Sequence, residues 1–156
     1  MRVWRLARKP FLQLDGEGTR LTGGRWNSEG VAVVYTSSTL SLATLEYLAH
    51  IDPEDIPDDL MAVTVEVPDR LPIEEVRLGD LPADWNRVFD HPRCVALGDE
   101  WIATSRSLGL RVPSALVPEE WNLLLNPAHS EAREVRIIGK RPFAFDRRLL
   151  RRGETG

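Results

Sequence analysis

The sequence predicts an α+β fold in a single domain. Apolar runs with the alternation or β-branched content of strands are mixed with helical segments, and the two kinds do not alternate strictly along the chain. A length of 156 residues is typical of one domain, and no repeat, low-complexity tract or linker divides it. We therefore expect one domain over residues 1–156, with a core at about 3–145 and a basic tail at 146–156.

Strands are expected where short apolar runs are rich in β-branched residues or alternate with polar ones. The run VAVVYTS is almost continuously apolar, which predicts a buried strand, and LMAVTVEVP alternates. The segment EVRIIGKRPFAFD predicts a strand pair, or one strand bent at Gly139. In chain order the predicted strands lie at 3–7, 31–37, 60–68, 73–78, 114–118 and 134–146.

One helix is predicted over STLSLATLEYLAHI, residues 38–51, which Ser38 or Thr39 can cap at its N-terminus. A second helix is expected over 93–108, where Gly109 would end it, and a shorter one over 82–88. Two stretches carry turn residues instead. Residues 10–30 are rich in glycine, and 119–129 are turn-rich or a short helical piece.

Composition excludes several classes of protein. A net charge of −4 and a pI near 5.4 argue against nonspecific nucleic-acid binding, which needs a basic face. No segment approaches the ~20 apolar residues of a membrane span, and residues 1–20 lack the apolar region of a signal peptide. The lone Cys94 cannot form an internal disulfide, which fits a reducing compartment. We therefore expect a cytoplasmic protein that binds neither nucleic acid nor membrane.

Common site motifs are missing from the sequence. The three histidines, His50, His91 and His129, are widely spaced, and no Cys-x-x-Cys or His-Glu-x-x-His is present, so we expect no metal. The glycines of residues 16–24 lead into a strand, whereas a dinucleotide fingerprint leads into a helix. The Gly-x-Ser-x-Gly elbow of many hydrolases is also lacking.

Two charged residues stand in unusual surroundings. Arg25 follows Gly23 and Gly24, which let the backbone approach a partner closely, and its planar guanidinium suits phosphate or carboxylate. Glu46 has three apolar residues among its four neighbours at helical spacing. Such a carboxylate either reaches water or an arginine at the rim of the core, or is held in a cleft to act on a ligand. Tyr35, taken alone, suits a strand core.

Several of these segments together are similar to the RES domain, a family named for its Arg, Glu and Ser. The matching segments are GGRWN, VVYTS, the helix that carries Glu46, and VPSALVPEEWNLLLNPAH. The similarity extends from WRLA near the start to EVRIIGKRPFAFD near the end. It implies a fold like the diphtheria-toxin type of ADP-ribosyltransferase. It also implies the toxin of a bacterial toxin–antitoxin pair, which consumes NAD and is held by an Xre-like antitoxin.

The resemblance also implies site residues. Arg25, Tyr35 and Glu46 take the catalytic positions, and NAD is the substrate, with no metal. The residues implied to bind NAD are Arg25, Tyr35, Ser114, Arg5, Asn122 and Asn126. Glu46 would face the positive charge that develops on the ribose. Arg25 would grip the pyrophosphate or ribose, and the glycines beside it would bring the backbone near the dinucleotide.

Three questions stay open at the level of sequence. The acceptor of ADP-ribose is water, phosphate or a protein side chain, since the resemblance allows all three. An alternative is a non-catalytic binding module that docks an Xre-like partner, in which Arg25 and Glu46 form a structural ion pair. A further alternative is an enzyme that acts on another nucleotide sugar with the same carboxylate chemistry.

Overall fold

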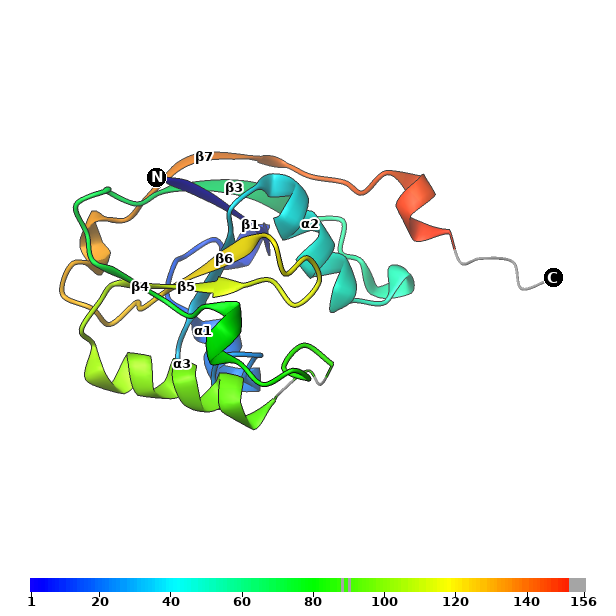
Figure 1. Ribbon diagram of the computed structural model, residues 1–156. Coiled ribbons are helices and arrows are strands. Elements are labelled where there is room, and N and C mark those ends of the chain that lie inside the picture. The colour runs from blue at the N-terminus through cyan, green and yellow to red at the C-terminus, as the bar shows by residue number, and fades with distance from the viewer. Residues whose placement is uncertain (88, 90, 152–156) are drawn as a thin grey trace.

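The computed structural model describes residues 1–87, 89 and 91–151. These residues form one seven-stranded sheet in the order β4-β5-β6-β2-β1-β3-β7, with helices packed against it (Figure 1). The strands are β1 (Arg2–Arg8), β2 (Val34–Ser37), β3 (Leu60–Glu66), β4 (Ile73–Glu75), β5 (Gly109–Pro113), β6 (Trp121–Leu125) and β7 (Arg136–Pro142). The α-helices are α1 (Glu17–Thr22), α2 (Leu40–Ala49) and α3 (Pro92–Thr104). The predicted α+β class is confirmed.

The strand order brings distant parts of the chain side by side. Every pairing in the sheet is antiparallel except that of β4 with β5. The central strand β2 pairs with β6 along its whole length, from Val34 opposite Leu125 to Ser37 opposite Asn122. On its other side β2 meets β1 through Trp4 and Ser37. Residues 34–37 therefore lie between segments from the two ends of the chain.

One hydrophobic core covers the part of the sheet built by β1, β2, β3 and β6. Its buried members include Val3, Val63 and Leu123, none of which is exposed. Alternate residues of these strands point to this core, as the alternating pattern of LMAVTVEVP predicts. The register of β1 with β3 runs without interruption from Arg2 to Arg8, which fixes the middle of the sheet.

A second core lies between α3 and the β5–β6 part of the sheet. It is rich in tryptophan and contains Trp26, Trp85 and Trp101. Gly98 of α3 lets the helix approach the backbone of Trp26, because a Cβ at this position would lie only 1.7 Å from the Trp26 carbonyl oxygen. The helix also holds the loop at Ser28, since Asp99 accepts hydrogen bonds from the backbone and the hydroxyl of Ser28.

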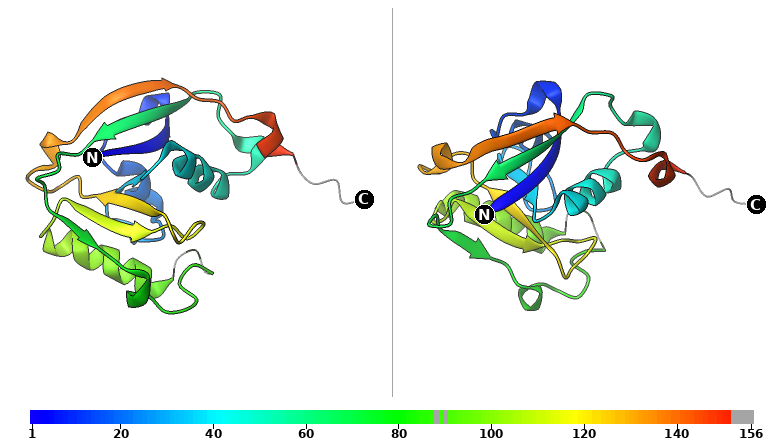
Figure 2. Two further views of the ribbon diagram at one scale, coloured as in Figure 1. Left: turned by 45° about the horizontal axis from the view of Figure 1, so that its top comes forward. Right: turned by 90° about the horizontal axis from the view of Figure 1, so that it is seen from above.

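The helix α2 packs against β1 and β2, apart from α3 (Figure 2). Of the two caps that the sequence predicts, Thr39 is the one used, and its hydroxyl accepts a hydrogen bond from the backbone of Leu42. Leu42 and Ala43 are buried against the sheet. The opposite face of the same helical turns carries Leu45, which is exposed. The cap and the packing fix where the later residues of α2 project.

Two predictions for the N-terminal half are wrong in detail. The turn-rich segment 10–30 contains the short helix α1, and the strand predicted over 31–37 begins only at Val34. The preceding residues bond to side chains instead of to a neighbouring strand. The backbone of Val33 donates to the Thr19 hydroxyl, and the Val31 carbonyl accepts from the Asn27 amide.

The predictions between residues 82 and 129 are less accurate. The structure has turns over 82–87, while Val88 lies outside the described residues. The second long helix ends at Thr104 instead of 108, because Ser105 adopts a left-handed conformation with φ 48°, and Gly109 begins β5. The strand predicted at 114–118 is a loop. The segment 119–129, predicted as turn-rich or a short helical piece, contains β6 at Trp121–Leu125.

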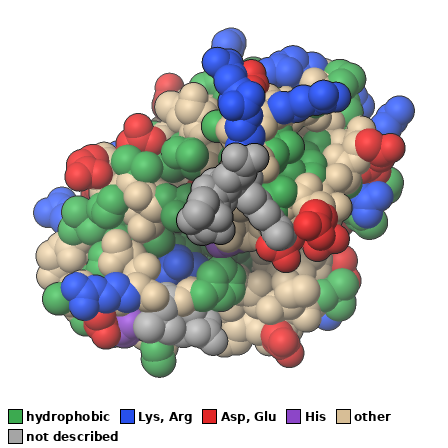
Figure 3. Space-filling model, turned by 90° about the vertical axis from the view of Figure 1, so that its right-hand side faces the viewer, with side chains coloured by type: hydrophobic (Ala, Val, Ile, Leu, Met, Phe, Trp, Pro, Cys, Tyr) green, Lys and Arg blue, Asp and Glu red, His purple; other side chains and the backbone are tan. Residues whose placement is uncertain are grey.

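The C-terminal segment contains one strand with a bulge. Of the two forms predicted for 134–146, a pair or one bent strand, β7 is the single strand, and its pairing with β3 shifts register beside Gly139, between Thr64 and Val65. The basic tail beyond it is described as far as Arg151, and the rest of 146–156 lies outside the described residues. Lys and Arg side chains crowd the upper edge of the face in Figure 3, and hydrophobic ones gather below them. Among the described residues, no helix is long and apolar enough to cross a membrane.

Candidate active site

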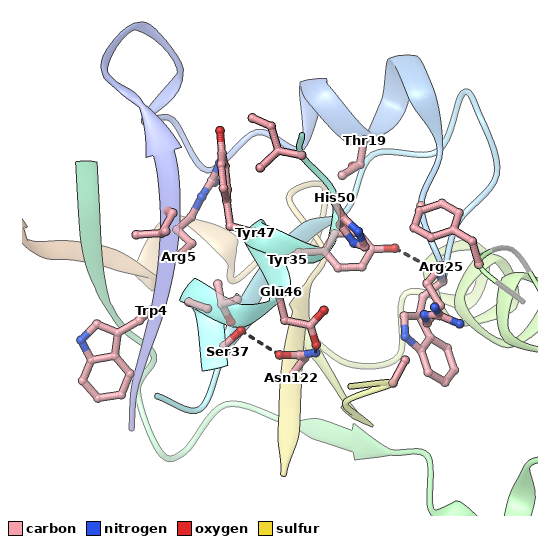
Figure 4. A pocket seen from close by; sticks show the side chains of 18 of the residues that line it. Trp4, Arg5, Thr19, Arg25, Tyr35, Ser37, Glu46, Tyr47, His50 and Asn122 are labelled. Atoms are coloured by element: carbon pink, nitrogen blue, oxygen red, sulfur yellow. Dashed lines mark hydrogen bonds between the residues drawn. The ribbon is translucent and has the colours of Figure 1, made fainter. Parts of the chain in front are cut away.

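A cavity of about 480 Å³ opens between β1, β2, α2 and the loop that precedes β2. Five of the residues predicted from the sequence line it: Arg5, Arg25, Tyr35, Glu46 and Asn122. They come from five separate segments, and Figure 4 shows Glu46 and Asn122 facing one another while Arg25 lies toward the other side. The fold thus brings most of the predicted residues to one place.

Glu46 is held by two neutral hydrogen-bond donors. Its Oε1 atom accepts from the Ser114 hydroxyl at 2.8 Å and from the Asn122 amide nitrogen at 2.7 Å. The side chain is half-buried in the wall of the cavity. Neutral donors stabilise a carboxylate without cancelling its charge. The site therefore presents a fixed negative charge to whatever occupies the cavity.

Ser114 lies behind Glu46 and has no exposed surface. Its oxygen accepts hydrogen bonds from the backbone of Leu116 and Val117, both at 3.1 Å, and its proton is directed to Glu46. The two backbone bonds explain why the segment predicted as a strand folds as a loop. Ser114 is not among the residues that line the cavity, and its hydroxyl contacts Glu46. Its contact with substrate stays a prediction.

Arg25 stands at the corner of a tight turn. Gly24 and Asn27 pair across this turn through two backbone hydrogen bonds, which leaves Arg25 and Trp26 between them. Trp26 enters the tryptophan-rich core, and Arg25 enters the cavity. The Arg25 guanidinium donates to the Trp85 carbonyl at 3.3 Å and lies 5.6 Å from the centre of the Phe89 ring.

Tyr35, in the neighbouring strand β2, fixes this turn through its hydroxyl. Its hydroxyl accepts a hydrogen bond from the Trp26 backbone at 3.0 Å and donates to the Asn27 side chain at 2.6 Å. Burial raises the pKa of the Tyr35 hydroxyl above its ordinary value, so the group stays protonated. A Cβ on Gly24 would lie 2.7 Å from this hydroxyl. Gly24 therefore makes room for Tyr35, and the approach of its backbone to a dinucleotide stays a prediction.

Arg5 places a second cation in the wall of the cavity. Its guanidinium reaches the Gln13 carbonyl oxygen at 3.5 Å. Burial lowers the pKa of Arg5, and the nearby charge of Asp15 acts in the opposite direction. A cation that has lost part of its hydration gains more from an anionic partner than an exposed one does. With Arg25, it gives the cavity two groups suited to an anion.

Asn126 is a second predicted residue that does not line the cavity. It follows the last residue of β6, at the opposite end of the strand from Asn122, and is only 1% exposed. Its amide donates to the Ser105 hydroxyl and accepts from the backbone of Ala128. These bonds tie the end of β6 to the end of α3, which is a structural role.

The ion pair of the non-catalytic alternative does not form. The contacts of Glu46 are to Ser114 and Asn122, and those of Arg25 include Trp85 and Phe89. In the part of the chain that the structure describes, no group of His, Cys, Asp or Glu side chains is arranged to hold a metal ion. The geometry is that of separate anionic and cationic walls around one cavity.

Sequence reasoning missed several residues of the site. Ser37 donates a hydrogen bond to the Asn122 side chain at 2.8 Å, and Tyr47, His50 and Phe89 also line the cavity. One signal was available for Ser37. It lies two residues after Tyr35 in the same strand, and residues at this spacing point to the same face. No comparable local signal marks Phe89.

Comparison with known proteins places these features in a family. The RES domain family model matches residues 2–146. The chain is 38% identical over 141 residues to a Prs ADP-ribosylating toxin of Sphingobium sp. (strain YBL2), covering 89% of this chain and 88% of the relative. It is 33% identical over 154 residues to a Toxin Res of Photorhabdus laumondii, covering 97% and 98% of the two chains.

A solved structure shares the fold. A chain in the crystal structure of the M. tuberculosis MbcT–MbcA toxin–antitoxin complex superposes with a TM-score of 0.76 at 18% identity, over 92% of this chain and 84% of that one. At this identity the likeness concerns the fold alone. The family model and the two relatives cover nearly the whole sequence, including the segments that carry Arg25, Tyr35, Glu46 and Asn122. The chain therefore belongs to the RES domain family.

Proposed function

We propose that this protein is the toxin of a toxin–antitoxin pair and cleaves the bond between nicotinamide and ribose in NAD. ADP-ribose then passes to an acceptor. The observation that carries the proposal is the Glu46 carboxylate, which two neutral donors fix in the wall of a cavity that also contains Arg5 and Arg25. Membership of the RES family and relatives with toxin names support it.

The chemistry of NAD cleavage fits the charges of this cavity. Nicotinamide leaves as a neutral molecule, so its departure puts positive charge on C1′ and the ring oxygen of the ribose. A fixed carboxylate stabilises this charge more in the transition state than in the substrate, which is the condition for catalysis. Glu46 also can accept a hydrogen bond from a ribose hydroxyl. No protonated acid is needed, because the leaving group needs no proton.

The arginines supply the binding energy for the rest of the dinucleotide. The pyrophosphate is anionic, and a guanidinium can donate two parallel hydrogen bonds to it. Arg25 is the stronger candidate for this contact, since its turn is held by Tyr35 and by α3. Arg5 approaches from β1. The ring of Tyr35 forms part of the wall and offers a surface on which nicotinamide can stack.

The acceptor is the finer part of the proposal. Water would give NAD hydrolysis, phosphate would give phosphorolysis, and a protein would give ADP-ribosylation. The name of the Sphingobium relative favours a protein acceptor. Three incubations with NAD separate these outcomes: buffer alone, buffer with inorganic phosphate, and a cell lysate. Mass spectrometry would then detect free ADP-ribose, a phosphorylated ADP-ribose, or modified protein.

A toxin that consumes NAD needs a partner that holds it inactive in the cytoplasm of its own cell. We propose an antitoxin of the Xre-like type that covers the cavity and places an acidic group near Arg25. Inhibition by the co-purified partner should then be competitive with NAD. Inhibition that excess NAD cannot relieve would point to a surface away from the cavity.

The decisive experiment is incubation of the purified protein with NAD while free nicotinamide is measured. The expected result is steady release of nicotinamide by the parent protein. The matched control is Glu46→Gln, which keeps the shape of the side chain and removes its charge. A folded parent protein that releases no nicotinamide in buffer, with phosphate or with lysate would reject the proposed reaction.

A further inference from the structure

A row of hydrogen-bonded side chains connects β2, β6 and α2 (Figure 4). The Ser37 hydroxyl donates to Oδ1 of Asn122 at 2.8 Å, and Nδ2 of Asn122 donates to Oε1 of Glu46 at 2.7 Å. Ser37 and Asn122 are direct partners in the antiparallel pairing of β2 with β6. Directly opposed residues of an antiparallel pair project from the same face, so this contact is built into the register of the sheet.

The direction of each hydrogen bond in this row is determined by chemistry. A carboxylate only accepts hydrogen bonds, so the Asn122 amide must present its nitrogen to Glu46. The amide oxygen then faces β2 and needs a donor, which the Ser37 hydroxyl supplies. Ser37 is only 4% exposed and lines the cavity beside Asn122. The carboxylate of Glu46 thereby selects one of the two orientations of the amide, and the Ser37 hydroxyl holds the amide oxygen in that orientation.

We propose that Ser37 is a positioning residue that acts on Glu46 through Asn122. The proposal rests on the proposed function, because it assigns Ser37 a part in the same reaction. Without the hydroxyl, the amide oxygen of Asn122 loses the side-chain donor that holds it, and the side chain can rotate so that its nitrogen moves away from Oε1 of Glu46. Glu46 then keeps only Ser114 as a firm donor and can turn away from the ribose.

The kinetic test compares the parent with Ser37→Ala. We expect kcat for nicotinamide release to fall about fivefold to tenfold, as for the loss of one hydrogen bond, with KM changed by less than about twofold. Ser37→Thr retains a hydroxyl in a residue that suits strands, and should keep kcat near that of the parent. A folded Ser37→Thr protein with the kcat of Ser37→Ala would contradict the proposal.

A double-mutant cycle tests whether Ser37 acts through Asn122. In an Asn122→Ala background the row is already broken, so Ser37→Ala should cause no further loss of kcat. The same fivefold to tenfold loss in both backgrounds would overturn the proposal, because Ser37 would then act by another route. Full kcat in Ser37→Ala would overturn it directly.

The matched control is Ser107→Ala. Ser107 is also a buried serine whose hydroxyl lies 2.8 Å from a glutamate, Glu74, but this pair is remote from the cavity. Ser107→Ala should lower the melting temperature and leave kcat unchanged. If Ser37→Ala lowers kcat only as far as Ser107→Ala does at an equal loss of stability, its role is merely structural and the proposal fails.

A readout that needs no activity separates this proposal from the proposed function. The side-chain amide of Asn122 can be followed by nuclear magnetic resonance, and its protons report the bond to a carboxylate. We expect these signals to move in Ser37→Ala and to stay in place in Ser37→Thr and Ser107→Ala. An unchanged amide in Ser37→Ala would overturn the proposal. A parent protein without NAD cleavage would reject the proposed function, while the amide signals would still decide whether Ser37 orients Asn122.

Discussion

Two buried serines, each bonded to a glutamate, lie at opposite ends of β5. Ser107 precedes the strand and Ser114 follows it, and their exposures are 2% and 0%. Each hydroxyl lies 2.8 Å from a glutamate oxygen, that of Glu74 for the first and that of Glu46 for the second. By residue type, distance and burial of the serine the two pairs are alike.

Their surroundings differ. Glu74 also forms an ion pair with Arg106 at 3.2 Å, and its side chain is 38% exposed at the surface. Ser107 itself accepts a hydrogen bond from the ring nitrogen of Trp101, which secures the end of α3. Glu46 instead receives a second neutral donor, Asn122, and lines a cavity. A charge that an arginine already neutralises stabilises the fold, whereas a charge fixed by neutral donors remains able to act on a ligand.

The largest expected effect comes from removing each charge in turn. Glu46→Gln should lower NAD cleavage by about 10²–10³-fold, the usual cost of one preorganised electrostatic group. Expression of the parent should arrest growth, and expression of the variant should not. Glu74→Gln should leave cleavage unchanged. Nicotinamide release measures the rate, and circular dichroism confirms folding. Equal rates for Glu46→Gln and Glu74→Gln would remove the distinction between the two pairs.

The second largest difference is expected between Arg25 and Arg106, in their effect on NAD binding. Arg25→Lys replaces a planar fork with a point charge and should weaken NAD binding by about 10–100-fold, because hydrogen bonds to charged groups are worth about 1.5–3 kcal/mol. Arg106→Lys should leave binding unchanged. Calorimetric titration with NAD in the Glu46→Gln background avoids turnover. If Arg25→Lys lowers the melting temperature and leaves NAD affinity intact, Arg25 is structural, and the binding-module alternative gains support.

The two serines should have similar effects on stability and different effects on rate. Each Ser→Ala change leaves buried polar partners unsatisfied, at a cost of about 1–3 kcal/mol. For Ser114 these partners include the backbone of Leu116 and Val117. Only Ser114→Ala should also lower kcat, by about tenfold, since one bond to Glu46 is lost. Thermal unfolding and nicotinamide release are the two measurements. A Ser107→Ala protein with an equal loss of kcat would show that both changes act through stability.

The smallest effect on rate is expected at Tyr35, a cavity residue whose hydroxyl has a structural task. Tyr35→Phe keeps the ring and should retain NAD cleavage within a few-fold, but it should destabilise the fold by about 1 kcal/mol. Burial raises the pKa of Tyr35 in the folded protein. Its contribution to stability is therefore complete below the unfolded pKa of about 10 and is lost as the pH rises further.

The stability difference between the parent and Tyr35→Phe should accordingly shrink above about pH 10. Denaturant unfolding at a series of pH values between neutral and alkaline measures it. A difference that grows with pH would mean that the hydroxyl is not protected from ionisation. A large loss of cleavage in a stable Tyr35→Phe protein would assign the hydroxyl to the reaction itself.

Local patterns in the sequence predicted those elements that neighbouring residues mark by alternation or by a cap. The strands β1 and β3 follow from alternating apolar residues, and the cap of α2 follows from Thr39 beside a helical segment. Family resemblance added Arg25, Tyr35, Glu46 and Asn122, which the structure brings to one cavity. Their roles in the reaction stay predictions. The same patterns were less accurate between residues 82 and 129. They predicted the helix α3, but they predicted turns or a short helical piece where β6 lies, because a short apolar run does not by its periodicity distinguish a buried strand from a helical piece.

Tertiary structure alone decided how the carboxylate is held. The hydrogen bonds that fix Glu46 join residues 68 and 76 positions apart, and the bond from Ser37 to Asn122 spans 85 positions. Propensity and periodicity act over a few residues, so they can place Glu46 on a helix and Ser37 in a strand without relating the two. The pairing of β2 with β6 sets Ser37 opposite Asn122, and the loop after β5 turns Ser114 away from the cavity. Both contacts depend on the register of a sheet whose strands come from distant parts of the chain, and that register is fixed by the burial of whole faces against the two cores.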